Sequence, residues 1–132
     1  MNVQRKIYIN NVLDVVTARM QAREMAKQLG FRTADQARIS LAASELARVL
    51  SWNADSAGEI VMSDTSQNGH QGMQVACQVE LRYLNTNDHR KQLDELSAPA
   101  RSLAGACELV DESIVEERSN AQALVTLIKW LT

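Results

Sequence analysis

The segment Thr33–Trp52 limits the fold of this chain more than any other part of the sequence. Its first residues, Thr33 to Gln36 (TADQ), predict a capping box, in which the Thr33 hydroxyl accepts from a main-chain amide while Gln36 reaches back. Apolar residues surround more than half of the helix that follows: Ala37, Leu41, Ala42, Ala43, Leu46, Ala47, Val49 and Leu50. We therefore expect a largely buried helix whose alanines let it lie close against a sheet.

Alternating side chains predict that sheet. From Met73 to Tyr83 apolar residues alternate with polar ones, so one face of this strand is expected to be buried and the other wet. Two hairpins are predicted, the first with a loop at Thr65–Gly72 marked by Asn68-Gly69, and the second joined at Ser119-Asn120. The remaining strands are predicted over Lys6–Asn10, Gly58–Ser63, Ser113–Arg118 and Ala121–Leu131.

Two further helices are predicted. The first runs from Asp14 to Gly30, and the third of the chain from Ala100 to about Asp111. A stripe of large apolar residues is expected to face the core on the first helix: Val12, Val16, Met20, Met25 and Leu29. Its solvent face is expected to carry Arg19, Arg23 and Lys27. The polar stretch Asn85–Pro99 is interpreted as a loop with a short helical turn.

The order of these elements is strand, helix, helix, strand, strand, helix, strand, strand, without repeats or a linker. Strands and helices segregated in this way predict an α+β fold. We expect a two-layer α/β sandwich in which about three helices cover one face of a mixed, mostly antiparallel sheet, and the wet face of the strand at 73–83 agrees with an open sheet face. A length of 132 residues suits one domain over residues 1–132.

Composition argues against several classes of function. A formal net charge of −2 disfavours non-specific nucleic-acid binding, which needs a basic surface. No apolar run is long enough to span a membrane and no secretory signal precedes the first helix, so we expect a cytoplasmic protein without membrane contact. Cys77 and Cys107 lack metal-site spacing and are interpreted as two buried thiols. His70 and His89 are interpreted as surface residues, and no metal site is expected.

One long segment also resembles a known family. Residues 6–62, and most specifically the run from Gly30 to Arg48 that contains GF-T-DQARI---ASELAR, resemble the N-terminal half of bacterial anti-sigma-factor and switch-protein serine kinases. A fainter likeness lies in Leu103–Glu117. The resemblance implies the Bergerat fold of the GHKL ATPases and, most closely, a switch-protein kinase of the stressosome pathway. It also implies a protein partner (an antagonist, a switch protein or a sigma-factor-like protein), and in some members the first helix contributes to homodimers.

In the family this resemblance points to, the central helix carries the N-box of an ATP site. A glutamate acts as base, an asparagine four residues later holds Mg²⁺, and a further position follows after another four, so that all three lie on one helix face. The matching positions in this chain are Glu45, Val49 and Asn53. The base position is retained, but Val49 has no oxygen with which to bind a metal.

The two other elements of the family's pocket are altered as well. The Asp-x-Gly-x-Gly turn that holds adenine corresponds to Arg82–Leu96, which contains no glycine and leaves Asp88 as the only candidate. The glycine-rich lid that cradles the phosphates corresponds to Ser97–Glu112, which retains only Gly105. Because all three elements are altered together, no cofactor is expected.

Three functional hypotheses remain open. The first is a pseudokinase that regulates a partner-switching or stress-signalling pathway by protein–protein binding. The second is an active ATP-dependent serine kinase that uses ATP and Mg²⁺, with Glu45 as base, to phosphorylate an antagonist or switch protein. The third is an adaptor for another small ligand in the emptied pocket, which requires that Val49 and Leu50 do not fill that space.

Two interpretations are open for Glu45 and for the two charged surfaces. Glu45 is either a remnant base or, as the sequence favours, one half of a structural ion pair with Arg48 or Arg82. Asn53 is interpreted as a capping or turn residue. The basic row of the first helix and the acidic cluster Glu108–Glu117 are either ordinary solvated surfaces or docking surfaces for a partner.

Overall fold

The predicted order of elements is confirmed in the computed structural model, which describes residues 3–52, 58–84 and 97–132. Three helices are present in these ranges: α1 (Val12–Gln28), α2 (Thr33–Ser51) and α3 (Ala98–Glu108). The strands are β1 (Gln4–Ile9), β2 (Gly58–Gln67), β3 (His70–Glu80), β4 (Glu112–Arg118) and β5 (Gln122–Trp130). None of the described helices is long and apolar enough to cross a membrane.

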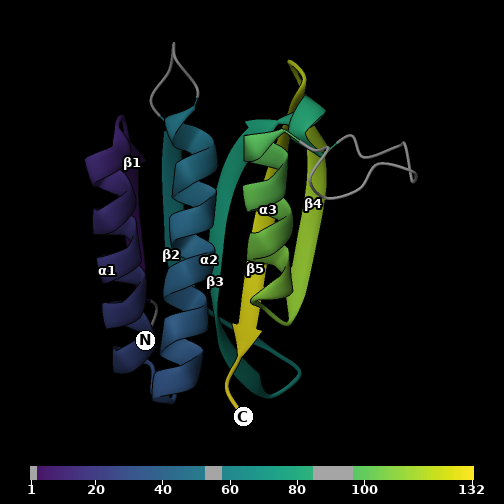
Figure 1. Cartoon of the computed structure of the whole chain (residues 1–132). Coiled ribbons are helices and arrows are strands. Elements are labelled where there is room, and N and C mark those ends of the chain that lie inside the picture. The colour runs from purple at the N-terminus through teal and green to yellow at the C-terminus, as the bar shows by residue number, and fades with distance from the viewer. Residues whose placement is uncertain (1–2, 53–57, 85–96) are drawn as a thin grey trace.

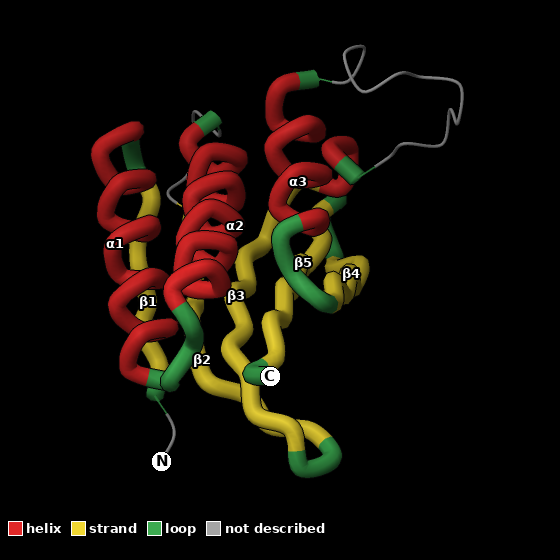
Figure 2. The backbone as a smooth tube through the Cα atoms, turned by 60° about the horizontal axis from the view of Figure 1, so that its bottom comes forward, coloured by secondary structure: helices red, strands yellow, loops and turns green. Residues whose placement is uncertain are grey.

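The strands form a five-stranded sheet in the order β1-β2-β3-β5-β4. Every pairing among the described strands is antiparallel, which makes the sheet more uniform than the predicted mixed one. The register aligns Ile7, Ile60, Cys77, Val125 and Val115 in one row across all five strands. The helices cover one face, with α1 over the β1 edge, so the predicted two-layer α+β sandwich is confirmed (Figures 1 and 2).

The first hairpin is longer and its turn tighter than the sequence indicates. β2 continues to Gln67 and β3 begins at His70, so only Asn68 and Gly69 form the turn, instead of a loop over Thr65–Gly72. Both turn residues have positive φ, 52° and 83°, as a two-residue hairpin turn requires. The alternating burial from Met73 onward is confirmed as far as Val79.

Two other boundaries differ from the prediction. The third strand stops at Glu80 and a short 3₁₀ turn, Leu81–Tyr83, follows it. In the second hairpin, Asn120 and also Ala121 adopt positive φ, so the turn is one residue longer than Ser119-Asn120. Of the predicted loop Asn85–Pro99, residues 85–96 lie outside the described part, and α3 has already begun at Ala98.

α2 is the buried helix that the sequence predicts. Ten of its 19 residues are buried, and all of these except Asp35 are alanine, serine, valine, leucine or isoleucine. Ser40 and Ser44 lie in the interior, where their hydroxyls donate to the main-chain oxygens of Ala37 and Leu41 at 2.9 and 2.8 Å. Because these hydrogen bonds lie within the helix, neither hydroxyl is left without a partner, and the small side chains permit close packing at little cost.

The predicted capping box at Thr33 is wrong. Arg32 is the N-cap of α2 and makes no side-chain cap bond, while the Gln36 amide donates to the main-chain oxygen of Phe31 at 2.8 Å. A capping box is found instead on α1, where Asn11 Oδ1 accepts from the Asp14 amide at 3.3 Å and Asp14 Oδ2 accepts from the Asn11 amide at 3.2 Å. The pattern of residues there, asparagine followed three later by aspartate, satisfies both orphan amides.

The predicted core stripe of α1 is also largely wrong. Val12, Val16 and Met20 are 73%, 46% and 66% exposed. The buried face consists of smaller residues with one long one: Val15, Ala18, Ala22, Met25 and Ala26. Alanines at this spacing let α1 approach its neighbours closely, whereas the large residues lie on the same outward side as the basic row.

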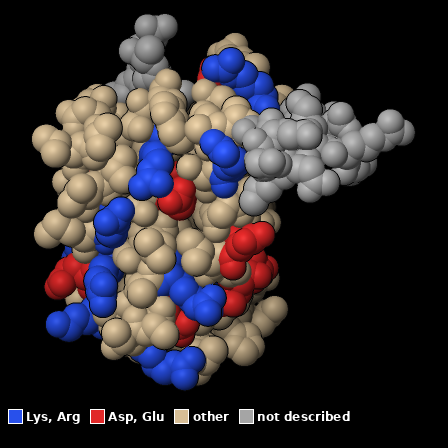
Figure 3. All heavy atoms as spheres, in the orientation of Figure 1, with Lys and Arg blue, Asp and Glu red and all other residues tan. Residues whose placement is uncertain are grey.

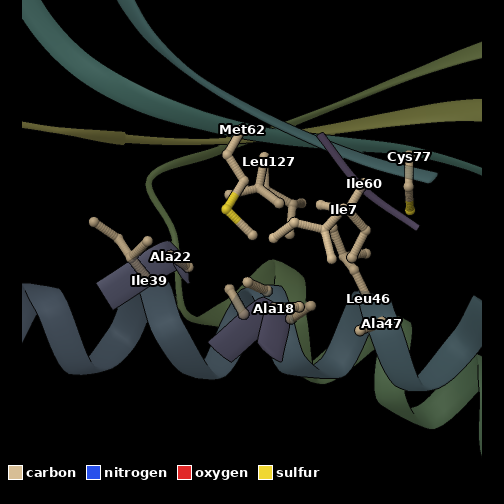
Figure 4. Close-up of a cluster of buried hydrophobic side chains, with 14 of the residues drawn as sticks. Ile7, Ala18, Ala22, Ile39, Leu46, Ala47, Ile60, Met62, Cys77 and Leu127 are labelled. Carbon is tan, nitrogen blue, oxygen red and sulfur yellow. The ribbon is translucent and has the colours of Figure 1, made fainter. Parts of the chain in front are cut away.

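The core lies between the sheet and the three helices. Figure 4 shows Ile7, Ile60, Met62 and Leu127 pointing from the strands toward Ile39, Leu46 and the alanines of the helices. Cys77 is buried in the same cluster, and burial raises the pKa of its thiol to about 12, because the charged thiolate is disfavoured away from water. Cys107 is only half-buried, so the prediction of two buried thiols is right for Cys77 alone.

One charged cluster links the helix layer to the sheet near the end of β5. The ammonium group of Lys129 lies 3.1 Å from Asp111 Oδ1 and 3.8 Å from Asp35 Oδ1. Asp35 is a buried residue of α2, and Asp111 also accepts from the Trp130 amide at 2.7 Å. β5 is therefore linked both to the start of α2 and to the segment that leads into β4.

Gly72 provides a test of this packing. A Cβ at Gly72 would lie 2.5 Å from the main-chain oxygen of Lys129 and 2.8 Å from Trp130 Cε3, and backbone cannot move aside cheaply. Gly72→Ala is expected to lower the free energy of unfolding by about 1–3 kcal/mol, measured by thermal and denaturant unfolding. Gly105→Ala is the matched control: no atom lies within 4 Å of the position that its Cβ would take, so a gain of roughly 0.5–1 kcal/mol is expected in a helix. Equal stability of the two variants would contradict the packing at Gly72.

Candidate functional site

The second half of α2 carries the residues that the sequence places in a nucleotide site. Glu45 and Val49 stand one turn apart, but their surroundings differ. The Glu45 side chain is 23% exposed, and its Oε1 lies 3.0 Å from Arg48 Nη1. This confirms the predicted ion pair with Arg48; Arg82 pairs with Glu80 instead. An exposed pair of this kind contributes little to stability, so the carboxylate is held in place rather than strongly stabilised.

Val49 belongs to the hydrophobic core. It is fully buried, and its neighbour Leu50 is 2% exposed. A Cβ at Gly58 would lie only 2.8 Å from Leu50 Cδ2, so the end of α2 packs directly on the first residue of β2. An aliphatic residue in these surroundings offers neither an oxygen nor space for a hydrated cation.

Gly105 lies in the middle of α3, the helix beside α2. It is half-buried, its φ is not positive, and no atom lies within 4 Å of the place a Cβ would take. The backbone there does not require glycine. α3 itself begins with Ser97 as N-cap, whose hydroxyl accepts from the Ala100 amide at 3.3 Å, and with Pro99 in its first turn.

The other two predicted site residues, Asn53 and Asp88, lie outside the described residues. Of the five candidates, three are therefore described: Glu45 and Val49 on α2, and Gly105 on the neighbouring α3. Side-by-side packing of α2 and α3 brings these two helices together (Figure 1). Among the described residues, no group of histidine, cysteine and carboxylate side chains is arranged to hold a metal ion.

α1 carries a surface that sequence reasoning placed in the core. We call it the α1 apolar face: Val12, Leu13, Val16 and Met20, all 46% exposed or more. Arg19, Arg23 and Lys27 are exposed on the same side of the helix, and Figure 3 shows basic side chains spread over the α1 and α2 side of the molecule. The alanines at 18, 22 and 26, which stand four apart, are the signal that would have indicated the buried side.

A cluster of acidic residues lies on the other side of the molecule. Acidic side chains gather beside the end of α3 in Figure 3, and Glu112, Glu116 and Glu117 are exposed along β4. β4 and the α1-covered β1 are the two opposite edges of the sheet. His70 is exposed at the start of β3, with its ring centroid 6.4 Å from that of Trp130, as the sequence predicts for a surface residue.

Comparison with known proteins gives the family. No family model matches the chain. It is 33% identical over 135 residues to the serine/threonine-protein kinase RsbT of Bacillus subtilis (strain 168), and the alignment covers 99% of both chains. An identity of this size over the whole length shows common ancestry, so the chain belongs to the family of this kinase.

The position of Val49 leads to a direct test of whether it is a core residue or borders an open pocket. Val49→Asn, which restores a metal-binding type of side chain, is expected to lower the free energy of unfolding by about 1–3 kcal/mol, because a buried amide has no partner among apolar neighbours. The measurement is denaturant unfolding. Leu41→Asn, at a 45% exposed position of the same helix, is the matched control for helix propensity. If both variants were equally stable, position 49 would have to reach water or a polar partner.

Proposed function

We propose that this protein is a regulator in a bacterial partner-switching or stress-signalling pathway, acting in the cytoplasm by binding another protein. On this proposal it is a pseudokinase that neither holds Mg-ATP tightly nor transfers phosphate. The observation that carries the proposal is the full burial of Val49 at the position where the resemblance expects a Mg²⁺-holding asparagine. Mg²⁺ requires oxygen ligands in near-octahedral geometry, and a core valine offers none.

Two further features support loss of the nucleotide site. Gly105 stands in an ordinary helical conformation, with no close approach that would require a glycine. The burial of Val49 and Leu50 also argues against the third hypothesis, a different small ligand in the emptied pocket, because both side chains already pack in the core. The alternative that keeps support is an active serine kinase: the relative is named a serine/threonine-protein kinase, and Glu45 retains a partly exposed carboxylate.

Nucleotide binding distinguishes the proposal from the kinase alternative. We expect the melting temperature to stay unchanged at millimolar Mg-ATP or Mg-ADP, measured by scanning fluorimetry. A ligand at a hundred times its Kd would add about 2.7 kcal/mol to the native state, which is a shift of several degrees for a domain of this size. A shift that requires Mg²⁺ would contradict the proposal and favour a kinase with an unusual metal site.

The α1 apolar face supports the protein-binding part of the proposal. Four large apolar side chains stand together in solvent, and three basic residues share that side of the helix. Contiguous exposed apolar surface of this kind is typical of protein-binding sites. We assign it to a different protein whose apolar centre is bordered by carboxylates, because a second copy would bring three more basic residues to the same contact and like charges disfavour it.

This assignment predicts the behaviour of the protein on its own. Both the native chain and a Val16→Glu, Met20→Glu double variant should sediment as monomers, and the variant should unfold within roughly 0.5 kcal/mol of the native chain, since exposed positions tolerate substitution. Leu41→Glu on α2 is the control for a charge at an exposed leucine. A concentration-dependent dimer of the native chain that the double variant loses would assign the face to a second copy.

A further inference from the structure

β4 is an edge strand that none of the described helices or strands covers on either face. It pairs with β5 and with no other described strand, so its outer edge carries main-chain N–H and C=O groups without a strand partner. All ten residues from 111 to 120 are exposed. Figure 2 shows β4 at the edge of the sheet beyond β5, away from α1 and α2.

The opposite edge strand, β1, is covered where β4 is exposed. On β1, Ile7 and Ile9 are buried beneath the helices, and Arg5 is anchored by hydrogen bonds to Gln21 and Gln28 of α1 at 2.6 and 3.0 Å. On β4, by contrast, Ile114 is 43% exposed and Val115 is 48% exposed, one on each face of the strand. Val115 belongs to the row of residues that begins at Ile7 and whose other members face the helices, but at β4 this row is exposed.

The charges of β4 define what can pair with it. Between residues 111 and 118 the strand and its first flanking residue carry four carboxylates: Asp111, Glu112, Glu116 and Glu117. Asp111 pairs with Lys129 at 3.1 Å and Glu116 with Arg118 at 3.0 Å, so the four carboxylates and these two cations together leave a net charge of −2. Natural edge strands are commonly protected by proline or by charged side chains, lysine above all; on β4 the charged side chains are three glutamates and one arginine, which repel acidic strands more than cationic ones. Apolar side chains at the centre with carboxylates toward both ends complement an added strand that is apolar in the middle and cationic at its flanks.

A groove begins beside the first residue of the strand. It has a volume of about 620 Å³, and its lining includes Asp111, Glu112, Trp130 and His70. The Trp130 indole is oriented by a hydrogen bond from its Nε1 to Glu112. An indole face next to carboxylates attracts a lysine or arginine side chain, through its π electrons as well as through charge.

We propose that β4 binds an extended segment of a partner protein, rich in lysine or arginine, as an added antiparallel or parallel strand. Main-chain hydrogen bonds to the free edge supply the binding, Ile114 and Val115 supply apolar contact, and the carboxylates select cationic side chains. A second copy of β4 is a poor occupant, because it brings four more carboxylates to the same edge. This surface goes beyond the proposed function: it lies at the opposite edge from the α1 apolar face and does not depend on whether the nucleotide site works.

The test uses the whole protein and a fluorescein-labelled peptide about as long as β4, with valines at its centre and lysines toward both ends. Binding is followed by fluorescence polarisation, and its location by hydrogen exchange of the β4 amides. We expect saturable binding that weakens with added salt, as expected for exposed charges, together with slowed exchange along β4. A Glu116→Lys, Glu117→Lys variant should weaken binding by at least about tenfold, while Glu24→Lys on α1 should leave it unchanged.

A second peptide separates strand addition from simple charge attraction. N-methylation of alternate residues keeps every positive charge but removes the amide donors that face β4, so its binding should be reduced to that of a glutamate–valine peptide. Equal binding of the methylated peptide, binding that the Glu116→Lys, Glu117→Lys variant does not weaken, or no binding at all would overturn the proposal. So would a dimer of the free protein that this variant abolishes, because a second copy would then occupy the edge. Each of these outcomes is independent of the response to Mg-ATP.

Discussion

The close approach of α2 to the sheet and to the helices on both sides of it is the contact on which the rest of the structure depends. Ala42, Ala43 and Ala47 are fully buried, and the buried serines bond within the helix, so five of the ten buried residues of α2 have small side chains that permit close packing. A single larger side chain in this row would have to displace a helix or a strand, since interiors are packed as tightly as organic crystals.

This packing also bears on the chemistry of the candidate site. Position 49 cannot serve both as a core residue and as a ligand to a hydrated cation, because one role needs an apolar side chain without access to water and the other needs an oxygen beside it. Glu45, one turn earlier, is partly exposed and pairs with Arg48 in contact with solvent. The second half of α2 therefore has a packing residue, Val49, at the metal position and retains a carboxylate, Glu45, at the base position.

The two edges of the sheet differ in cover and in charge. β1 lies under α1, which presents apolar and basic side chains outward, whereas β4 is bare and acidic. Three other strands separate these edges, a distance over which salt screens exposed charges strongly. Each surface therefore attracts partners by its own charge, and occupation of one has little electrostatic effect on the other.

Much of the fold could be predicted from local patterns. The alternation from Met73 to Val79 and the apolar surface of Thr33–Ser51 determine a wet-faced strand and a buried helix, since both follow from side-chain periods within one segment. The Glu45–Arg48 pair follows from the same helical spacing. Sequence alone did not determine which side of α1 is buried: large residues at Val12, Val16 and Met20 have the period of a core stripe, but the face that is buried consists mostly of alanines. That choice, like the burial of Val49 and the bareness of β4, depends on how closely distant segments approach one another, and only the tertiary structure decides it.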